Sequence, residues 1–487
     1  MTISIVNVEE TIERVMNQLA QEKDLSPALR ASLEVLLLLV SLLLGRLGIN
    51  SKNSSKPPSA DPNREKTLKS KGRKPGGQVG HNGATLQPVL EPDLIRLISV
   101  DRRILPPGDY RDAGFETRQV FDLDISTVVT EFRAQVLQDQ AGNRYVAPFP
   151  EGVTRSVQYG HGVKAHSVYM SQFQLIPYKR IEDHFMDQMQ LPVSAGTIFN
   201  FNQEAYGLLE HFDQWVRQQL ISSDLIHADE TGINIGGKRV WLHNASNPKF
   251  TFFSPHAKRG SEALDEIGIL PVFKGTLCHD HWKPYFKYGT RHALCNAHLL
   301  RELERAWEQD KQEWAQAMIV LLKEINGAVL DAGDHLNDIV AENYRLRYRA
   351  LLAEAERECP PPDESQRKGR GRLARSKARN LLERFQAFET DILRFMKDPE
   401  VPFTNNLAEN DLRMTKVQQK ISGCFRSWDG ARIFCRVRSY LSTCRKQGVT
   451  ASEALRLLFE GKLPEFISSP IGVDGSTSKG LSENCAE

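Results

Sequence analysis

The 487-residue sequence has few cysteines and almost no net charge. It contains seven cysteines, none before Cys278, and their spacing shows no disulfide framework, so they fit a reducing cytoplasm better than a secreted scaffold. Lys plus Arg (63) nearly balance Asp plus Glu (61), so the net charge of +2 does not itself point to a polyanionic partner. The length exceeds one ordinary core and predicts several domains.

One prominent apolar run, VLLLLVSLLL at Val35–Leu44, does not predict a membrane span. A spanning helix needs about 20 apolar residues. This run is about half as long, and Glu34 and Arg46 flank it. Residues 1–50 are therefore predicted to form a helical segment, either buried in a core or used for self-association through a coiled coil. The sequence leaves both interpretations open.

Positive charge is concentrated in a segment that has almost no apolar residues. Between Ser51 and Lys74 there are eight basic residues and two acidic ones. Residues 51–90 are rich in Ser, Pro, Gly and Lys and are predicted to be a flexible linker, because they cannot bury enough surface to fold alone. The core of this linker, GRKPGG, is similar to short arms that insert arginine into a narrow minor groove. Lys71, Arg73 and Lys74 are therefore candidate DNA contacts, with a merely solvated linker as the alternative.

Two modules are predicted after the linker. Residues 91–155 alternate apolar and polar residues in short runs broken by Gly and Pro, which predicts a small β-rich module. Residues 156–220 are predicted to be helical. Within them Ile176–Ala205 suggests a helix, a short turn and a second helix capped by Ser194, which fits a helix-turn-helix that binds a major groove. A helical hairpin packed on a core would give the same pattern.

The pattern changes to strands after residue 220. LIHADETGINIGGKRVWLHNASNPKFTFFSPHA predicts three strands with a GG hairpin turn, and GTLCHDHW predicts another short strand. A long, charged, helical stretch then precedes the NNLAEN helix. The predicted architecture is an α/β core with a helical insertion, with these bounds: core 221–292 and 400–448, insertion 293–399, C-terminal helix and disordered tail 449–487.

Three carboxylates are candidates for metal binding. Asp229 and Asp280 are each predicted to end a strand, and Glu409 lies on the downstream helix. Phosphoryl transfer on DNA uses paired hard divalent ions to stabilise the attacking and leaving oxygens, and such ions prefer carboxylate ligands. The three acids are thus predicted to hold two Mg²⁺ or Mn²⁺. The alternatives are turn roles for the aspartates, with Glu230 as a competing ligand, and a surface Glu409–Arg413 ion pair on a helix capped by Asn406.

A zinc site is a rival interpretation of two C-x-x-H pairs, Cys278 with His281 and Cys295 with His298. In a strand, Cys278 and His281 would point to opposite faces, so no zinc is expected. Cys295 and His298 are better explained as the start of a helix packed near the Asp280 strand, with Arg301 reaching outward.

An ordered series of motifs resembles a known family. The series consists of SKNSSKPPSADPN, GRKPGGQVGHNGATL, YGHGVKAHSVYMSQFQLIPYKR, HADETGINIGGKRVWLHNA, HDHWKPYF, CNAHLLREL and NNLAENDLR. Together these motifs, from about Asn50 to Gly448, look like the insertion sequence 66 family of DDE transposases. The resemblance implies an RNase H-like core, a helical insertion before the last acid, and Mg²⁺-dependent cutting and joining of DNA. The family's catalytic acids fall on Asp229, Asp280 and Glu409, and its C-x-x-H element falls on Cys295 and His298.

The resemblance also sets expectations about partners. We expect binding to the element's terminal inverted repeats and to target DNA, a homo-oligomer, accessory proteins from the same element, and a cytoplasmic, nucleoid-associated bacterial protein. Arg413, Lys416 and Lys420 are candidates to hold DNA phosphates, with solvated helix charges as the alternative. Residues 91–155 contain no cysteine where the family often carries a zinc finger, so zinc is not expected there. A non-catalytic DNA-binding regulator is the main alternative function, and a structural coiled-coil protein is a distant one.

Overall fold

The computed structural model describes residues 2–3, 6–22, 25–47, 50, 53–54, 61, 86–363, 365, 373 and 375–467. These residues fall into two compact units, one comprising 1–64, 149–185 and 192–487 and the other 65–148 and 186–191. Lys71, Arg73 and Lys74, most of the predicted basic arm, and the predicted tail lie outside the described residues.

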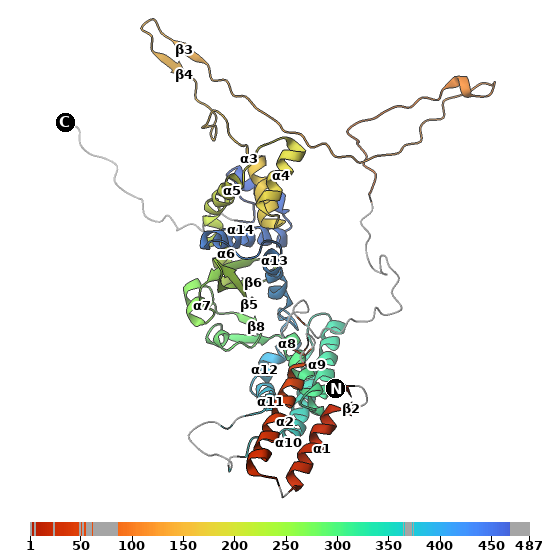
Figure 1. The fold of residues 1–487 in the computed structure, drawn as a ribbon. Helices are drawn as coiled ribbons and strands as arrows, with labels where there is room; N and C mark the ends of the chain where they lie inside the picture. The colour runs from red at the N-terminus through yellow and green to blue at the C-terminus, as the bar shows by residue number, and fades with distance from the viewer. Residues whose placement is uncertain are drawn as a thin grey trace, which may run out of the picture. The chain divides into compact units, whose positions relative to one another are not determined.

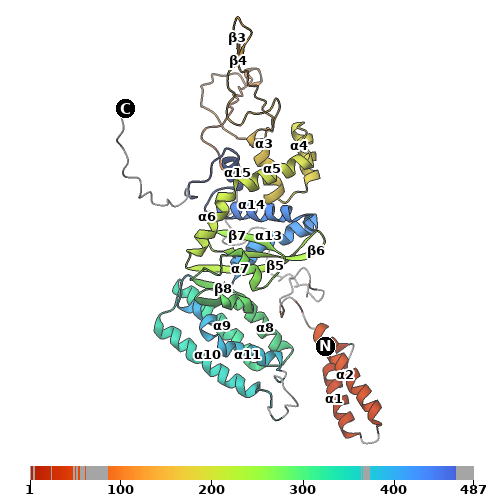
Figure 2. The same cartoon turned by 90° about the vertical axis from the view of Figure 1, so that its left-hand side faces the viewer.

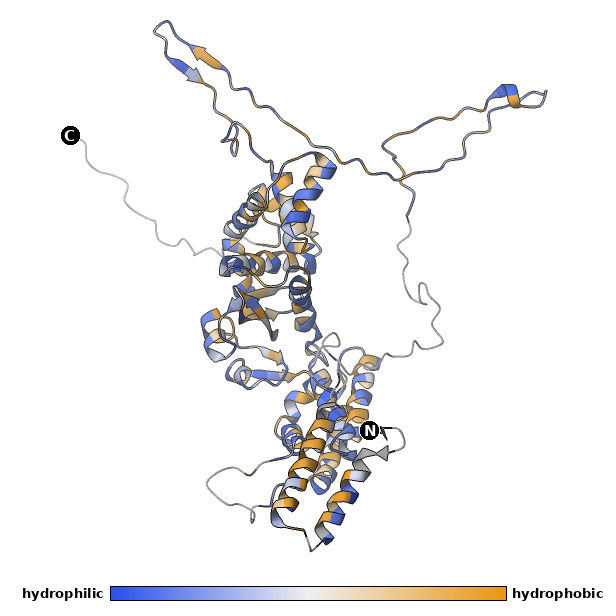
Figure 3. Ribbon diagram, viewed as in Figure 1, coloured by the Kyte–Doolittle hydropathy of each residue, from blue (hydrophilic) through white to orange (hydrophobic). Residues whose placement is uncertain are grey.

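Two helices follow a short hairpin at the N-terminus (Figure 1). The hairpin pairs β1 (Thr2–Ile3) with β2 (Val6–Asn7), and the helices are α1 (Val8–Gln21) and α2 (Pro27–Leu47). Apolar residues dominate α2 (Figure 3), and most of its described leucines, including Leu36, Leu39 and Leu43, are exposed. Burial in the protein's own core does not account for this run. Among the described residues, no helix combines the length and hydropathy needed to cross a bilayer.

The described part of the second unit, residues 86–148 and 186–191, has little regular structure. Residues 86–148 contain the single 3₁₀ turn η2 (Arg102–Ile104) and one hairpin, β3 (Val136–Gln138) paired with β4 (Arg144–Val146). None of residues 86–148 is buried. The alternating pattern in residues 91–155 thus corresponds to two three-residue strands rather than a β-rich module, because residues 86–155 hold no further strand or α-helix that could form a layer against the apolar side chains.

Helices follow in the larger unit, with these bounds: α3 His161–Val168, the π-helical turn η3 Tyr169–Phe173, α4 Tyr178–Met189, α5 Ala195–Leu208 and α6 Glu210–Ile221. The Ser194 hydroxyl accepts a hydrogen bond from the Thr197 backbone and caps α5, as its sequence predicts. One face of α5, including Ile198 and Phe201, is buried. The helix–turn–helix pattern therefore exists, and this face of its second helix packs within the protein.

A five-stranded mixed sheet follows, with these strands: β5 Leu225–Ile235, β6 Lys238–Ser246, β7 Thr251–His256, β8 Thr276–His279 and β9 Arg291–Leu294. The order is β7-β6-β5-β8-β9. β5, β6 and β7 are antiparallel, whereas β8 and β9 extend the sheet parallel to β5. Gly236 and Gly237 have φ of 54° and 78°, which the two-residue β5–β6 turn requires. The α/β class is confirmed. The sequence did not predict β9, since four residues carry little periodicity.

Helices from the C-terminal part lie against the sheet (Figures 1 and 2): α13 (Asn406–Ser422) contacts β5 and β6, and α14 (Trp428–Lys446) contacts β7. Leu412 and Phe434 pack with Ile233 and Leu242 in a core between them. α15 (Ala451–Phe459) follows α14 and packs on it.

Between β9 and α13 the chain forms a helical subdomain. Its elements are α8 Asn296–Glu308, α9 Glu313–Ala332, α10 Asp338–Glu358, α11 Lys377–Ala387, α12 Glu389–Ile392 and the 3₁₀ turn η6 Arg394–Met396. Two short helices lie within the sheet segment, α7 Ser261–Ile267 and the 3₁₀ turn η4 Lys283–Lys287. The subdomain has its own core around Trp314, Tyr348 and Phe385, which Leu225 and Cys278 of the sheet join. It occupies the residues predicted to be a helical insertion.

Candidate active site

Strand register brings Asp229 and Asp280 together. β5 and β8 run parallel, and their last paired residues are His227 and Cys278. Continuing this register by two residues on each strand places Asp229 beside Asp280. Asp280 directly follows β8, as predicted, but Asp229 does not end its strand. β5 continues to Ile235 because β6 pairs with it throughout, so Asp229 lies where pairing with β8 stops.

Asn405 attaches Glu409 to this edge of the sheet. Asn405 is buried, donates from Nδ2 to the Ala228 carbonyl (2.9 Å) and accepts from His227 Nδ1 at 2.7 Å. These bonds reach the two residues that precede Asp229, and Glu409 follows one turn later on α13. Asn405 occupies the N-cap position, but its side chain bonds the strand rather than the helix. The local interpretation of Asn406 as the cap is wrong, because Asn406 is the first helical residue.

The three carboxylates are close enough to repel one another. Burial, then repulsion from Glu230, Asp280 and Glu409, raises the pKa of Asp229 well above its usual value. Each of the three predicted acids is nevertheless partly accessible to solvent. A cation at this edge would stabilise the ionised form of Asp229, as expected of a site that binds positive charge.

Glu230, the carboxylate next to Asp229, is occupied by contacts with other side chains. Its side chain is 1% exposed, receives a hydrogen bond from the Tyr285 hydroxyl and pairs with Arg259, whose Nε lies 2.7 Å from Oε1. Arg259 also stacks on Trp241 and Trp282. Glu230 is therefore held by protein partners and is a poor competitor for a metal. Neither Arg259 nor Tyr285 has a sequence signal that marked it in advance.

The C-x-x-H pair of α8 borders the acidic cluster. Cys295 is buried and accepts a hydrogen bond from the Asn405 backbone N–H (3.1 Å), and His298 Nδ1 lies 3.7 Å from Glu409 Oε1. Burial lowers the pKa of His298 below its usual value, although the charge of Glu409 opposes this shift. Arg301 was expected to reach outward, but its guanidinium lies 4.0 Å from Glu409 Oε2. Glu409 therefore faces His298 and Arg301 of α8 instead of forming the ion pair with Arg413 that the local interpretation predicts.

The remaining basic candidates lie along α13. Arg413, Lys416 and Lys420 are exposed, as phosphate contacts must be. Lys416 donates to the Gly232 carbonyl (3.0 Å), and attraction to Asp229 opposes the lowering of its pKa by burial. Lys416 is thus the one whose charge acts directly on the acidic cluster.

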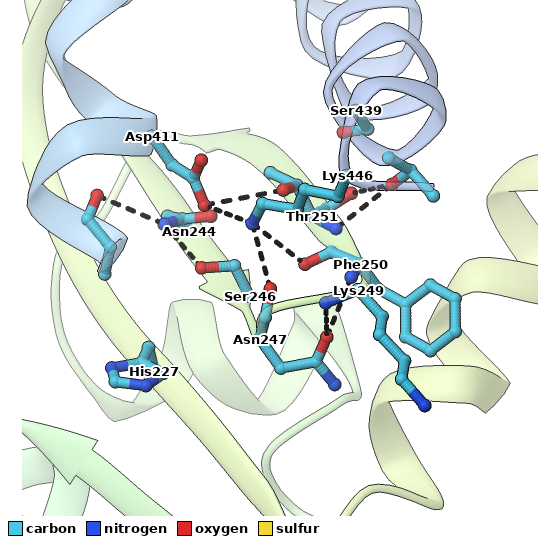
Figure 4. Close-up of polar contacts among 12 residues, drawn as sticks. His227, Asn244, Ser246, Asn247, Lys249, Phe250, Thr251, Asp411, Ser439 and Lys446 are labelled. Atoms are coloured by element: carbon cyan, nitrogen blue, oxygen red, sulfur yellow. Dashed lines mark hydrogen bonds and ion pairs between the residues drawn. The ribbon is translucent and has the colours of Figure 1, made fainter. Parts of the chain in front are cut away.

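Asp411, the next acid on α13, belongs to a separate polar network (Figure 4). Its Oδ2 lies 2.8 Å from Lys446 Nζ, which also donates to the carbonyls of Asn247 and Phe250. The network fastens α13 and α14 to the β6–β7 turn. As its helical position predicts, Asp411 does not join Asp229 and Asp280.

A comparison with protein families identifies the family of the chain. The family model described as Transposase IS66 family matches residues 156–433, more than half of the chain, and the match includes all three carboxylates. The chain belongs to the IS66 family of transposases. Membership of the IS66 family implies a transposase role and DNA as a partner. A second model, a family of unknown function (DUF6444), matches residues 5–87. A comparison with curated proteins found no match.

Proposed function

We propose that this IS66-family protein is a DDE transposase that cleaves DNA and joins it to a target, using Asp229, Asp280 and Glu409 on an RNase H-like core. The observation that carries the proposal is the convergence of three carboxylates from β5, the end of β8 and the start of α13. The mixed sheet, with two strands added parallel to β5, supports the RNase H-like assignment.

The donor set suits hard divalent ions. All three side chains offer carboxylate oxygens, which Mg²⁺ and Mn²⁺ prefer. Glu409 Oε1 is buried without a hydrogen-bond partner, and Asp229 resists ionisation when no cation is present. Two such ions, held by these three residues, would stabilise the charge that develops on the attacking and leaving oxygens.

The proposed reaction has two steps. Hydrolysis of a phosphodiester at the element's end frees a 3′-OH, and this hydroxyl then attacks a target phosphodiester by in-line transesterification without a covalent protein intermediate. The chain's own residues hold the ends in place. Arg413, Lys416 and Lys420 are exposed on the helix that carries Glu409, where they can bind the flanking phosphates.

The direct test is strand cleavage. Purified protein is expected to nick DNA carrying the element's ends in Mg²⁺ or Mn²⁺ and then to join the 3′-OH to a second duplex. Asp280→Asn is expected to lower cleavage by at least about 10³-fold, because removing a metal ligand removes transition-state stabilisation. Equal rates for the variant and the wild type would refute the assignment. DNA binding without cleavage by the wild type would favour the regulator.

The basic arm gives a second prediction, made from sequence alone. Replacing Ser51–Lys74 with a Gly/Ser linker of equal length should flatten the plot of log K against log salt, by about 0.9 for each phosphate that the arm neutralises. The measurement is DNA affinity over a salt series. An unchanged slope would show that the segment serves only as a linker.

We also propose that α2 mediates self-association. Six leucines of this 21-residue helix are exposed, a pattern that suits packing against a second copy: Leu29, Leu36, Leu38, Leu39, Leu42 and Leu43. A homo-oligomer would allow two element ends to be held together, and accessory proteins of the same element remain an expectation.

A further inference from the structure

A second group of ligand atoms lies beside the acidic cluster. Cys295 Sγ, a ring nitrogen of His298 and a carboxylate oxygen of Glu409 all lie within 4.8 Å of one another. Of the described residues, these three form the one set of His, Cys, Asp and Glu side chains with this spacing. The set differs from the zinc site weighed from sequence, since Cys278 and His281 are not part of it.

Local geometry holds the three residues in place. Cys295 is the N-cap residue of α8, and His298 lies three residues later on the same face of its first turn. Two hydrogen bonds join this turn to the segment before α13. The Asn405 backbone N–H donates to Cys295 Sγ (3.1 Å), and the Asn296 N–H donates to the Phe403 carbonyl (3.1 Å). The starts of α8 and α13 therefore face each other.

Two of the ligand atoms have no other partner. His298 Nδ1 and Glu409 Oε1 are buried and make no hydrogen bond, and they lie 3.7 Å apart, too far for a hydrogen bond between them. In a tetrahedral site with metal–ligand distances of about 2.0–2.3 Å, neighbouring ligand atoms are about 3.3–3.8 Å apart. The 3.7 Å between His298 Nδ1 and Glu409 Oε1 is already in this range, and Cys295 Sγ needs to approach by no more than about 1.3 Å.

We infer that Cys295, His298 and Glu409 form a binding site for a thiophilic divalent ion of the Zn²⁺ or Co²⁺ type. The set of one thiolate, one imidazole and one carboxylate leaves a fourth position open. Binding converts the Cys295 S–H to a metal-bound thiolate and releases one proton. The Asn405 N–H acts as the outer partner that orients the sulfur.

The consequence for cleavage rests on the proposed function. Glu409 is shared between this site and the Asp229–Asp280 cluster. When its carboxylate binds the ion beside Cys295, it is not available as a ligand for Mg²⁺. Zn²⁺ at one equivalent is therefore expected to inhibit Mg²⁺-dependent cleavage, and Cys295→Ser is expected to relieve this inhibition.

Co²⁺ titration of the full-length protein tests the binding site itself. The wild type is expected to develop the near-ultraviolet thiolate-to-Co²⁺ charge-transfer band and to saturate at one equivalent. Cys295→Ser keeps an acceptor for the Asn405 N–H but should lack the band. His298→Gln should bind Co²⁺ about tenfold or more weakly. The matched control is Cys424→Ser, which removes an exposed thiol and should leave the band unchanged.

Asp229→Asn separates the two hypotheses, because Asp229 belongs only to the acidic cluster. The Co²⁺ band in this variant should equal that of the wild type whether or not the protein cleaves DNA. Absence of the band in the wild type, or its persistence in Cys295→Ser, would overturn the inference. A band without inhibition by Zn²⁺ would keep the site and refute the competition for Glu409.

Discussion

Glu409→Gln is expected to abolish strand cleavage while leaving the fold and DNA binding intact. The amide keeps the size of the side chain but removes the negative charge that two divalent ions require. Stability should change little, since Arg301 lies 4.0 Å from the Glu409 carboxylate and His298 lies 3.7 Å from it. Such loose, partly exposed contacts contribute about 0–1 kcal/mol.

Two measurements check this prediction: cleavage at the element's ends, and the rise in melting temperature on adding Mn²⁺. Bound ions stabilise only the folded state, so the variant should lose both cleavage and the Mn²⁺-dependent rise. The matched control is Glu262→Gln on α7, where an exposed glutamate pairs with Lys258. Cleavage retained by Glu409→Gln would show that another carboxylate completes the site.

Asp411 is unsuitable as the control, although its position two residues from Glu409 suggests it. It is 15% exposed and pairs with Lys446, which is 17% exposed (Figure 4). An Asp411→Asn variant could lose activity through instability alone, so its result would not identify the catalytic acid.

Lys446→Met is expected to destabilise the protein by about 2 kcal/mol, less than for a fully buried pair because some solvent reaches both charges. The variant leaves the Asp411 carboxylate without its partner and leaves the Asn247 and Phe250 carbonyls each without one donor. The measurement is the midpoint of thermal unfolding without metal, which should fall by several degrees.

Two further variants make the Lys446 result interpretable. Lys462→Met removes an exposed lysine and should stay within about 0.5 kcal/mol of the wild type. The double variant Asp411→Leu/Lys446→Met removes both charges and should recover part of the stability. Equal midpoints for Lys446→Met and Lys462→Met would show that the network holds no stabilising charge pair.

The strands and the hairpin turn of the sheet could be predicted from apolar runs and from the GG pair, because these signals are local in the sequence. The GG turn appears as predicted, with both residues at positive φ. β9 and the full length of β5 were missed, since both depend on pairing partners distant in sequence. The apolar alternation in residues 91–155 predicted more strands than the structure contains. A periodic pattern forms stable strands only where another layer of structure covers them.

The sequence by itself determined the α/β class, the family and the three candidate carboxylates, because residue types and the order of motifs can be read directly from the sequence. Tertiary structure decided how they act. Strand register places Asp229 beside Asp280, and hydrogen bonds from Asn405 help to hold Glu409 to the same edge. The same holds for two further contacts. Arg259 binds Glu230 from 29 positions away, and Cys295 and His298 lie beside Glu409 although more than 100 residues separate them in the sequence. No local sequence pattern encodes contacts over such separations.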